Sequence, residues 1–396
     1  MIVNRLNITQ KGLAGVSFFS TAVYGILLSI LSPLLPSIAD TFSLSLSQTG
    51  TIFTINFFGF VTFTFLSGFF ADKYGKKKIL SIDLLGMVIS LCLLGISSQF
   101  SLVLICMFFI GGFSGVLESM FSAVLVEANP FKEAFYVNTC QIFFGIGAMV
   151  GPVTAAFWVT KGLPWRWCYF VLSALFLICL LLLIFTNSNK GRSVSQSISI
   201  KAVKKIISNR KMQLLCLCMF CYSGAEAGSW GWLSTFLTTE SGFSIQYSGV
   251  AISLFWVVVV AGRIGCLGAL KKHNERNIVI VLALLTAIGI ILSTFLNNLL
   301  WLWGGIVIMG LGYSAQWPLI VAHGTKDWPE YSGTAATLLI GSCGVGMMVI
   351  PMLIGIVGEV FGMRWAMTIP SLLMIVIALI FIYLITRDKR EKRAHG

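Results

Sequence analysis

Charged residues are scarce in this sequence. Only 10% of its 396 residues are Asp, Glu, Lys or Arg, whereas a soluble domain carries about 25%. Hydrophobic residues make up 57% of the chain, and the mean hydropathy is +0.92. A water-soluble fold of this length could not bury so much apolar surface, and no stretch is polar enough to form a soluble domain. The composition therefore predicts a chain embedded largely in lipid.

Several kinds of reaction centre are also missing from the sequence. There is no G-x-x-x-x-G-K-[ST] motif, so ATP-driven transport is not expected. No nucleophile–base arrangement is apparent, so neither an enzyme nor a cofactor is predicted. Cys216, Cys218 and Cys221 are close in sequence, but they lie in an apolar stretch with no histidine nearby. We expect no metal site, because such cysteines act as small apolar residues.

Long apolar runs are abundant. A transmembrane helix needs about 20 mainly apolar residues, and the sequence has twelve runs of this kind, which predict an all-α membrane protein with twelve transmembrane helices. The first run is too long for the core of a signal peptide, so no cleavable leader is expected. The predicted spans are 13–36, 47–70, 79–98, 101–126, 135–159, 166–186, 213–238, 245–268, 277–296, 299–322, 333–357 and 365–386.

The basic residues orient these spans. The formal charge is +13, and Lys and Arg gather in short segments between apolar runs, mainly 73–78, 190–211, 271–276 and 387–393. Loops rich in Lys and Arg stay on the cytoplasmic side of a membrane. We therefore predict a multi-pass protein of the cell (inner) membrane with both termini in the cytoplasm. The positive charge serves topology, and nucleic acid is not an expected partner.

An internal repeat appears at a constant offset of 199 residues. The segment GIGAMVGP (145–152) aligns with GVGMMVIP (344–351), and Gly111 and Pro130 align with Gly310 and Pro329. The repeat predicts two pseudo-symmetric six-helix halves, 1–186 and 213–396, joined by a basic cytoplasmic linker over 187–212. Parallel repeats of this kind bind substrate near the membrane midplane, between the halves.

The segment GFFADKYGKKK (68–78) resembles the loop signature between the second and third helices of the major facilitator superfamily. The resemblance covers the whole chain and implies that fold, acting as a monomer in the bilayer. It assigns a gating role to Asp72, Lys73 and Gly75, with Asp72 capping a helix or pairing with a basic partner when the cytoplasmic side closes. Arg263, at one end of the eighth span, is predicted to serve the same closed state.

A narrower resemblance comes from GVLESMFSAVLVEANP (115–130), VNTCQIFFGIGA (137–148) and YSGAEAGSWGWLSTFL (222–237). These segments look like helices 4, 5 and 7 of the fucose:proton symporter branch and its glucose-transporter relatives. The branch's helix 4 acid carries over to Glu118 and its helix 5 glutamine to Gln141. Two departures weaken the case for fucose itself: Phe144 replaces an asparagine, and the first helix has no acid.

Ionisable groups deep in a membrane cost ~2.5–3.5 kcal/mol on insertion scales, so each is a functional candidate. Glu118 and Gln141 lie at similar depths on adjacent spans, about 10 Å from the cytoplasmic boundary at 1.5 Å per residue. Two converging polar side chains suit a hydroxylated ligand, and a carboxylate there can load and release a proton. We predict Glu118 as the proton-coupling site and Gln141 as a substrate ligand; the alternative is a structural hydrogen bond between helices.

Further candidates lie in the second half. Glu226 is near the middle of the seventh span, and Trp230 follows one helical turn later, an arrangement that suits a sugar because indole stacks on pyranose C–H faces. The tenth span contributes three more candidate substrate ligands, Tyr313, Gln316 and Trp317. Each of these residues has a purely structural alternative.

Three polar residues are treated differently. Asp83, about one turn into the third span, is predicted to pair with the nearby lysines. Tyr24 and Asn56 point in directions that the sequence does not fix, so they are not assigned to the site.

The function predicted from these features is secondary active transport by alternating access. The favoured form is proton-coupled symport of a monosaccharide or sugar-like solute, with sodium as the other coupling ion left open. The alternative is a proton-coupled drug or metabolite exporter, because GIGAMVGP also partly resembles the glycine-rich antiporter signature of the fifth helix.

Overall fold

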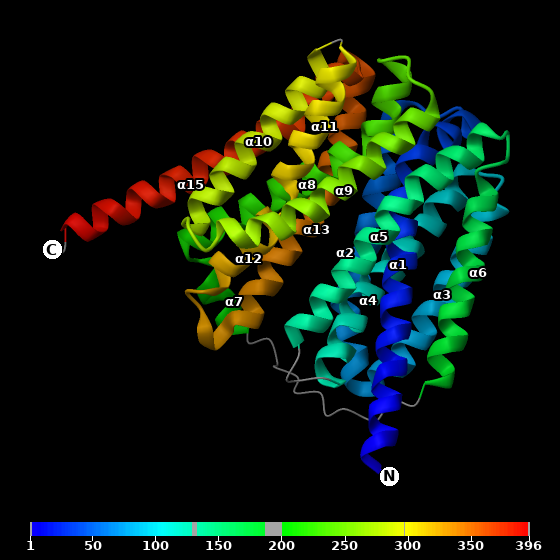
Figure 1. The fold of residues 1–396 in the computed structure, drawn as a ribbon, viewed down its shortest axis with the longest axis horizontal. Helices are drawn as coiled ribbons and strands as arrows, with labels where there is room; N and C mark the ends of the chain where they lie inside the picture. The colour runs from blue at the N-terminus through cyan, green and yellow to red at the C-terminus, as the bar shows by residue number, and fades with distance from the viewer. Residues whose placement is uncertain (1, 129–132, 187–199, 297, 395–396) are drawn as a thin grey trace. The chain divides into compact units, whose positions relative to one another are not determined.

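A computed structural model gives the structure of the chain and describes residues 2–128, 133–186, 200–296 and 298–394 (Figure 1). Within these residues the regular structure is helical, with no strand. The helices are α1 (Ile2–Phe42), α2 (Leu46–Tyr74), α3 (Lys76–Gly95), α4 (Phe100–Ala128), α5 (Glu133–Thr160), α6 (Arg166–Phe185), α7 (Ile200–Ile207), α8 (Arg210–Thr239), α9 (Ile245–Ala269), α10 (Glu275–Phe295), α11 (Leu299–Tyr313), α12 (Gln316–Thr325), the 3₁₀ turn η1 (Pro329–Tyr331), α13 (Ser332–Phe361), α14 (Met363–Ala366) and α15 (Thr368–Ala394).

The long helices confirm the prediction of an all-α, multi-pass membrane protein. By length and composition, eleven helical stretches in the described residues are apolar enough to cross a membrane. The seventh predicted span, 213–238, falls on α8, a helix of 30 residues. It is not among the eleven, because its serines, glycines and Glu226 lower its hydropathy. The predicted span that falls short of this apolar threshold is thus one that carries an acid near its middle.

One predicted span is divided near its middle. The run 299–322 is divided into α11, which ends at Tyr313, and α12, which begins at Gln316. Ser314 and Ala315 form a turn between the two helices. The sequence offered no signal for this interruption, because neither residue is a strong helix breaker. It leaves main-chain carbonyl groups that need partners other than helical N–H groups.

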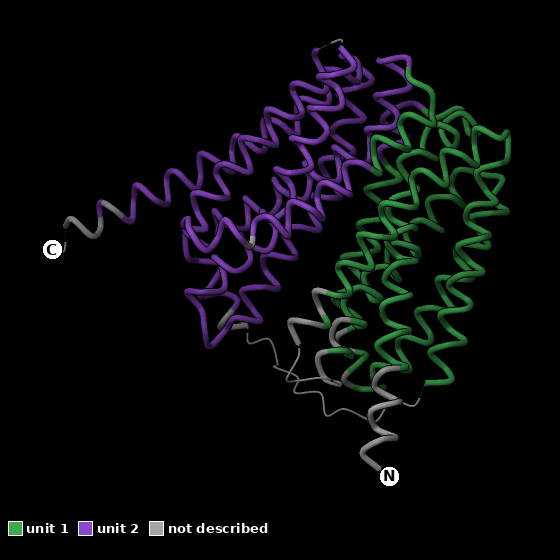
Figure 2. Tube along the Cα trace, viewed as in Figure 1, with its two compact units in different colours: residues 1–44, 51–195, 243–253 green, residues 45–50, 196–242, 254–396 purple. Residues whose placement is uncertain are grey.

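The chain forms two compact units (Figure 2). Unit 1 comprises residues 1–44, 51–195 and 243–253, and unit 2 comprises residues 45–50, 196–242 and 254–396. The main division, after residue 195, falls within the expected linker 187–212. Residues 187–199 of that linker lie outside the described part, so its assignment stays a prediction. The start of α2 is grouped with unit 2 and the start of α9 with unit 1.

Small residues bring helices together in unit 1, where α1 packs against α5, and α3 packs against α4 and α6. A Cβ atom added to Gly147 on α5 would lie 1.9 Å from the carbonyl oxygen of Ala22 on α1. One added to Gly111 on α4 would lie 1.8 Å from the carbonyl oxygen of Asn56 on α2. Both positions are therefore places where two backbones approach too closely for any side chain.

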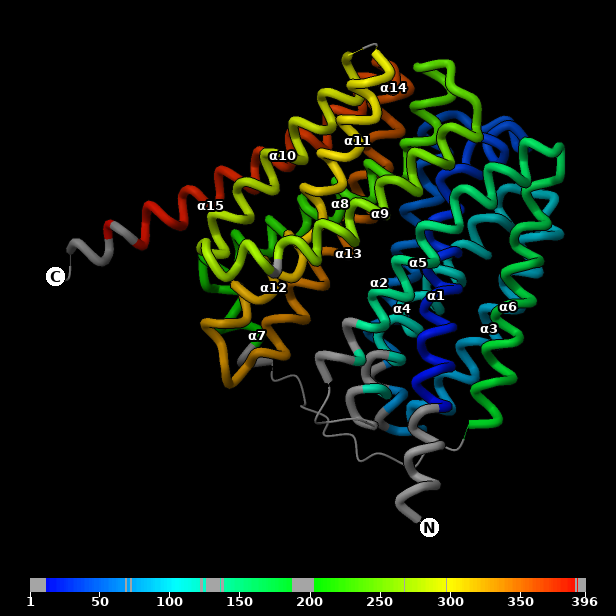
Figure 3. Tube along the Cα trace, in the orientation of Figure 1, coloured from blue at the N-terminus to red at the C-terminus, as the bar shows by residue number. Residues whose placement is uncertain are grey.

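Unit 2 repeats this packing. Here α8 packs against α13 and α15, and α10 lies beside α11 and α15 (Figure 3). A Cβ atom on Gly346 would lie 2.2 Å from the Phe220 carbonyl oxygen, and one on Gly310 would lie 3.1 Å from the Phe255 carbonyl oxygen. Gly111 and Asn56 in unit 1 correspond to Gly310 and Phe255 at the 199-residue offset. The sequence repeat therefore corresponds to equivalent helix–helix contacts in the two halves.

Candidate functional site

The N-terminal candidate site is built around Glu118 on α4. The carboxylate oxygen Oε2 accepts a hydrogen bond of 3.1 Å from the Tyr24 hydroxyl on α1. Tyr24 is buried, whereas the Glu118 side chain is exposed. The Tyr24 ring also contacts Phe144 on α5, with 5.4 Å between ring centroids. A buried phenol thus holds a carboxylate that remains accessible, as a group that exchanges a proton or binds a polar ligand requires.

Gln141 is half-buried on α5, next to α4. It lies eight residues after the start of α5, and Glu118 lies ten residues before the end of α4. At 1.5 Å per residue these positions are about 12 and 15 Å along the two helices, so their levels are comparable, as the sequence predicted. Asn56 has a structural role, because its Nδ2 donates to the Met107 carbonyl oxygen at 3.0 Å.

The C-terminal candidate site is built around Glu226 on α8. The Tyr222 hydroxyl, one turn earlier, lies 2.8 Å from Glu226 Oε1 and 3.1 Å from the Tyr313 carbonyl oxygen on α11. Its single proton is shared between these two acceptors. Tyr222 is buried and Glu226 is half-buried. In both units a tyrosine on the first helix of the half is hydrogen-bonded to an acid and to a group on the fourth helix; in unit 1 the acid is that group, and in unit 2 it is the Tyr313 carbonyl.

The helix interruption lies at this site. Tyr313 supplies its carbonyl to Tyr222, and the carbonyl of Ser314 accepts a 2.9 Å hydrogen bond from Nε of Arg263 on α9. Both carbonyls stand at the turn between α11 and α12. Non-helical backbone is tolerated at membrane depth where protein groups satisfy it, and broken helices commonly build transporter sites. Arg263 thus belongs to the acid-containing cluster of unit 2, while its predicted gating role stays a prediction.

Aromatic side chains pack around Tyr222, the hydrogen-bond partner of Glu226, and farther along α8. The Tyr313 hydroxyl is hydrogen-bonded to Ser229 Oγ at 3.0 Å, and its ring lies 5.9 Å from those of Tyr222 and Phe255. The Trp230 ring is 6.3 Å from that of Trp256 on α9. Tyr313 and Trp230 are buried, so here they form the packed wall beside Glu226. Their predicted contact with substrate stays a prediction.

Gln316 and Trp317 point in different directions. Gln316 is fully buried, and its Nε2 contacts Thr286 Oγ1 on α10 at 3.2 Å and the Gly312 carbonyl oxygen at 2.9 Å. These contacts join its amide to α10 and α11. Trp317 has an exposed side chain. Both stay predicted substrate ligands, although the structure does not join either of them to the Glu226 cluster.

The predicted gating signature lies at the junction of α2 and α3. Gly75 has φ of 87°, in the left-handed region that glycine adopts readily, and it makes the turn between the helices. Lys73 is exposed, with Nζ 5.2 Å from the centroid of the Tyr74 ring. The Asp72 side chain lies outside the described part of the structure. The gating roles of all three signature residues stay predictions.

The expected pairing of Asp83 with lysines is wrong. Asp83 is 2% exposed on α3, and within the described residues neither carboxylate oxygen has a hydrogen-bond partner. Lys77 is engaged elsewhere, donating from Nζ to the carbonyls of Ile184 and Thr186. Asp83 faces the interior because it belongs to the buried stripe of α3, one turn beyond Leu80 and before Met87.

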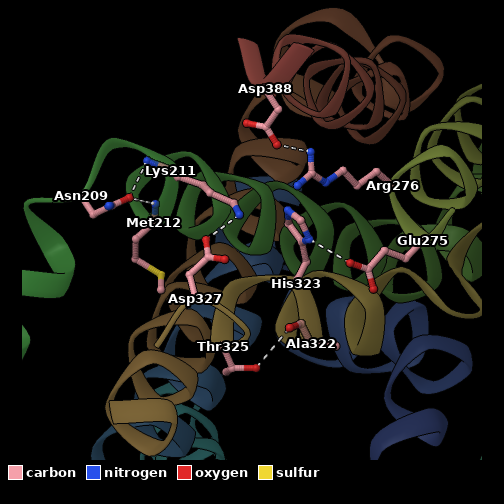
Figure 4. A network of polar contacts seen from close by, with 10 residues as sticks. All are labelled: Asn209, Lys211, Met212, Glu275, Arg276, Ala322, His323, Thr325, Asp327 and Asp388. Carbon is pink, nitrogen blue, oxygen red and sulfur yellow. Dashed lines mark hydrogen bonds and ion pairs between the residues drawn. The ribbon is translucent and has the colours of Figure 1, made fainter. Parts of the chain in front are cut away.

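A second polar network joins helix ends in unit 2 (Figure 4). Lys211 pairs with Asp327, Arg276 with Asp388, and His323 Nδ1 lies 3.1 Å from Glu275 Oε1. The last pair includes a buried histidine on α12. The contacts connect the starts of α8 and α10 with α12, the residues after it and α15. They support the frame of unit 2 and lie apart from the Glu226 cluster.

Sequence reasoning missed Tyr24. A signal was present: Tyr24 and Tyr222 occupy corresponding places on the first helices of the two halves, at an offset of 198. The repeat was recognised at 199, from later helices. The α1 and α8 contacts show the same one-residue shift, since Gly147 meets Ala22 and Gly346 meets Phe220. A search tolerant of that shift would have paired the two tyrosines.

Comparisons with known proteins give a consistent result. A relative from Erwinia tasmaniensis, described as a TsgA protein homolog, is 25% identical over 98% of this chain and 98% of its own. An alanine variant of the nucleoside transporter NupG superposes with a TM-score of 0.81 at 14% identity, covering 95% of this chain and 99% of that one. An alanine variant of the E. coli fucose:proton symporter FucP gives 0.65 at 19% identity, covering 96% and 98%.

The family model described as the Major Facilitator Superfamily matches residues 17–344. This match spans most of both halves, including Glu118, Glu226 and the glycine contacts of Gly111, Gly147 and Gly310. Together with the loop signature, the repeat and the helical fold, it confirms the resemblance that the sequence suggested. The chain therefore belongs to the Major Facilitator Superfamily, whose members are membrane transporters and not enzymes.

Proposed function

We propose that this protein is a proton-coupled symporter for a monosaccharide or a sugar-like solute, and that it works by alternating access. The observation that carries the proposal is that each half holds one glutamate against a tyrosine hydroxyl. These pairs are Tyr24–Glu118 at 3.1 Å and Tyr222–Glu226 at 2.8 Å. Inserting an acid into a membrane costs free energy, so two acids in a chain with so few charges are expected to have a function.

Glu118 is the proposed proton site. Its carboxylate is accessible, which allows exchange with water, and its hydrogen bond to Tyr24 stabilises the ionised form. Protonation would weaken that bond, because a neutral acid is a poorer acceptor. A proton arriving at Glu118 would therefore loosen a link between α1 and α4, which gives proton binding a direct effect on helix packing.

Glu226 is the proposed centre of the sugar site, with Trp230 and Tyr313 beside it. A carboxylate accepts hydrogen bonds from sugar hydroxyls, and the aromatic groups offer flat apolar faces. The Tyr222 proton is shared between Glu226 and the Tyr313 carbonyl at the helix interruption. A sugar hydroxyl that binds to or leaves Glu226 would change how the Tyr222 hydrogen bond is divided between Glu226 and the Tyr313 carbonyl. Gln141 on α5 is proposed as a substrate ligand in its own right.

The solved structures with this fold support the choice of substrate class. They include a nucleoside transporter and a fucose:proton symporter, and both nucleosides and fucose present a ring with hydroxyl groups. At 14% and 19% identity the likeness itself establishes the fold alone. The substrate class therefore rests on the acid and aromatic groups of this chain.

We also propose a placement in the cell (inner) membrane, with both termini in the cytoplasm and the protein acting as a monomer. The basic segments carry this orientation, since Lys and Arg are retained on the cytoplasmic side. Lys211, Arg276 and Lys326 all lie on the side assigned to the cytoplasm.

The function is tested by proton flux in proteoliposomes with an external pH-sensitive dye. Fucose, xylose and a nucleoside are added in turn to liposomes containing wild type, Glu118→Gln or Glu330→Gln. Glu330 is an exposed acid on η1, so its variant controls for the loss of one negative charge. We expect alkalinisation of the medium on addition of a sugar or nucleoside, retained in Glu330→Gln and lost in Glu118→Gln.

The same liposomes separate the other functions. A response that requires sodium and is indifferent to the pH gradient would make sodium the coupling ion. Proton release on adding lipophilic cations, with no response to any hydroxylated solute, would identify an exporter. Retained sugar-driven alkalinisation in Glu118→Gln would remove Glu118 as the proton site while leaving symport intact.

A further inference from the structure

The interior of unit 1 contains an acid that the proposed transport site does not use. Asp83 lies in the buried stripe of α3 with an exposed fraction of 2%. Neither carboxylate oxygen is hydrogen-bonded to any protein group in the described residues. Its neighbours in the stripe are Leu80, Leu84 and Met87, all with no exposed surface. A titratable group is thus enclosed by apolar packing.

The contacts between α3 and α6 fix where Asp83 lies along the bundle. The two helices are antiparallel: Lys77 reaches the Ile184 carbonyl, and Ser173 Oγ donates to the Val88 carbonyl at 3.1 Å. Asp83 falls between these contacts, at the level of Cys179. Cys179 is fully buried and lies beside the hydroxyl of Ser20 on α1.

The contact between α3 and α4 shows where Asp83 lies along the helices relative to Glu118, the proposed proton site. A Cβ atom on Gly86 would lie 2.2 Å from the ring of Phe113 on α4, so these two helices touch three residues beyond Asp83. Because α3 and α4 are antiparallel, Asp83 faces the part of α4 about one turn later, near Leu117. Glu118 is the next residue. The two acids therefore lie at about the same level of unit 1.

The lack of hydrogen-bond and ion-pair partners determines whether Asp83 is protonated. An ionised carboxylate taken out of water is stable only when paired or fully hydrogen-bonded, and otherwise it takes up a proton. Lys77, on the same helix, is engaged elsewhere, with the carbonyls of Ile184 and Thr186. Among the side chains that the structure describes on α3, α4 and α6, the titratable and charged groups are Lys76, Lys77, Lys78 and Cys92 on α3, Cys106 and Glu118 on α4, and Arg166, Cys168, Tyr169 and Cys179 on α6. Glu127 also belongs to α4, but its side chain lies outside the described part.

We propose that Asp83 is a second proton-binding site of the N-terminal half, occupied by a proton in the packing described and distinct from Glu118. The proton exchanges with solvent when the contacts between α3 and α6 loosen, at the level where Cys179 and Ser20 provide polar atoms. The ligand is the proton itself. This site stands whether or not Glu118 couples transport to protons, because it depends only on burial and on missing partners.

Infrared spectroscopy of the full-length protein tests the proposal at pH 7. A protonated carboxylic acid has a carbonyl band separate from the carboxylate bands, and the chain has only five aspartates. We expect one aspartic acid band, which shifts on ¹³C labelling of the aspartate side chain. The band is lost in Asp83→Asn and retained in Glu118→Gln. Isotope labelling needs no variant, so it separates aspartic from glutamic acid bands even if Asp83→Asn fails to fold. Of the other aspartates with described side chains, Asp40 is exposed and Asp327 and Asp388 are ion-paired, so an aspartic acid band at pH 7 is assigned to Asp83.

Transfer of folded wild-type protein to D₂O then tests exchange. We expect the aspartic acid band to shift while the protein remains folded. A band that never shifts would identify a sealed structural acid and overturn the proposal. It would also be overturned if no aspartic acid band exists at pH 7. A carboxylate band that responds to NaCl would replace the proton site with a cation site. None of these outcomes depends on sugar transport or on Glu118.

Discussion

Gly147 offers the sharpest test of how the helices of this transporter pack. Substitution by alanine would place a Cβ atom 1.9 Å from the Ala22 carbonyl oxygen, 2.8 Å from its carbonyl carbon and 3.0 Å from the Ile26 nitrogen. All three atoms belong to the backbone of α1, so no side chain can rotate out of the way. Because Cβ contacts under 3.0 Å essentially never occur, α1 and α5 must move apart locally by about 1 Å.

The magnitude follows from overpacking. Forcing extra volume into a packed core costs about 1–3 kcal/mol, and a rigid backbone contact places Gly147→Ala toward the upper end. In a unit of this size each kcal/mol lowers the melting temperature by about 2–4 °C. We expect thermal unfolding in detergent, followed by intrinsic fluorescence, to show a loss of several degrees. Gly346→Ala should behave alike, because its Cβ atom would lie 2.2 Å from the Phe220 carbonyl oxygen.

Gly15→Ala is the matched control. It makes the same change on α1, but a Cβ atom at Gly15 meets nothing within 4 Å. Alanine favours a helix over glycine by about 1 kcal/mol, so this variant should be as stable as wild type or slightly more stable. If Gly147→Ala and Gly15→Ala have equal melting temperatures, the close approach of α1 and α5 is wrong.

Three further predictions concern stability. Asp83→Asn should be more stable than wild type at pH 7 but not near pH 4. Folding of wild type takes up a proton at Asp83, and the free-energy cost of this uptake grows by about 1.4 kcal/mol per pH unit. If the difference in melting temperature between the two proteins is the same at every pH, Asp83 is not protonated. Trp232→Phe should lower the free energy of unfolding by about 1–3 kcal/mol, because it removes the 2.8 Å hydrogen bond from Nε1 to the Pro351 carbonyl. Trp301→Phe is the control: Trp301 is exposed, so its melting temperature, followed by light scattering, should change little. Asp327→Asn should change the free energy of unfolding by less than about 0.5 kcal/mol despite the ion pair with Lys211. The Asp327 and Lys211 side chains are 48% and 21% exposed, so both charges are well hydrated. A larger drop in melting temperature would mean that the ion pairs at the helix ends of unit 2 act cooperatively.

The sequence alone determined the class of this protein and most of its architecture. Low charge and long apolar runs require a lipid environment, and the basic segments between the runs predict an orientation. The 199-residue repeat predicted two equivalent halves, and the structure gives its physical basis in glycine contacts such as Gly111 with Asn56 and Gly310 with Phe255. The superfamily signature at 68–78 agreed with the family match. These features are encoded locally, in composition, run length and turn residues.

Only the tertiary structure decided which side chains meet. A helix in lipid is apolar on every side, so hydrophobic periodicity does not reveal which face is buried. For that reason the sequence could not direct Tyr24 toward Glu118, and it placed Asp83 among lysines instead of in the interior. The interruption at Ser314 also lacks a local signal, because it is stabilised by Tyr222 and Arg263 from other helices. Contacts between distant segments depend on helix rotation and depth, which three-dimensional packing sets.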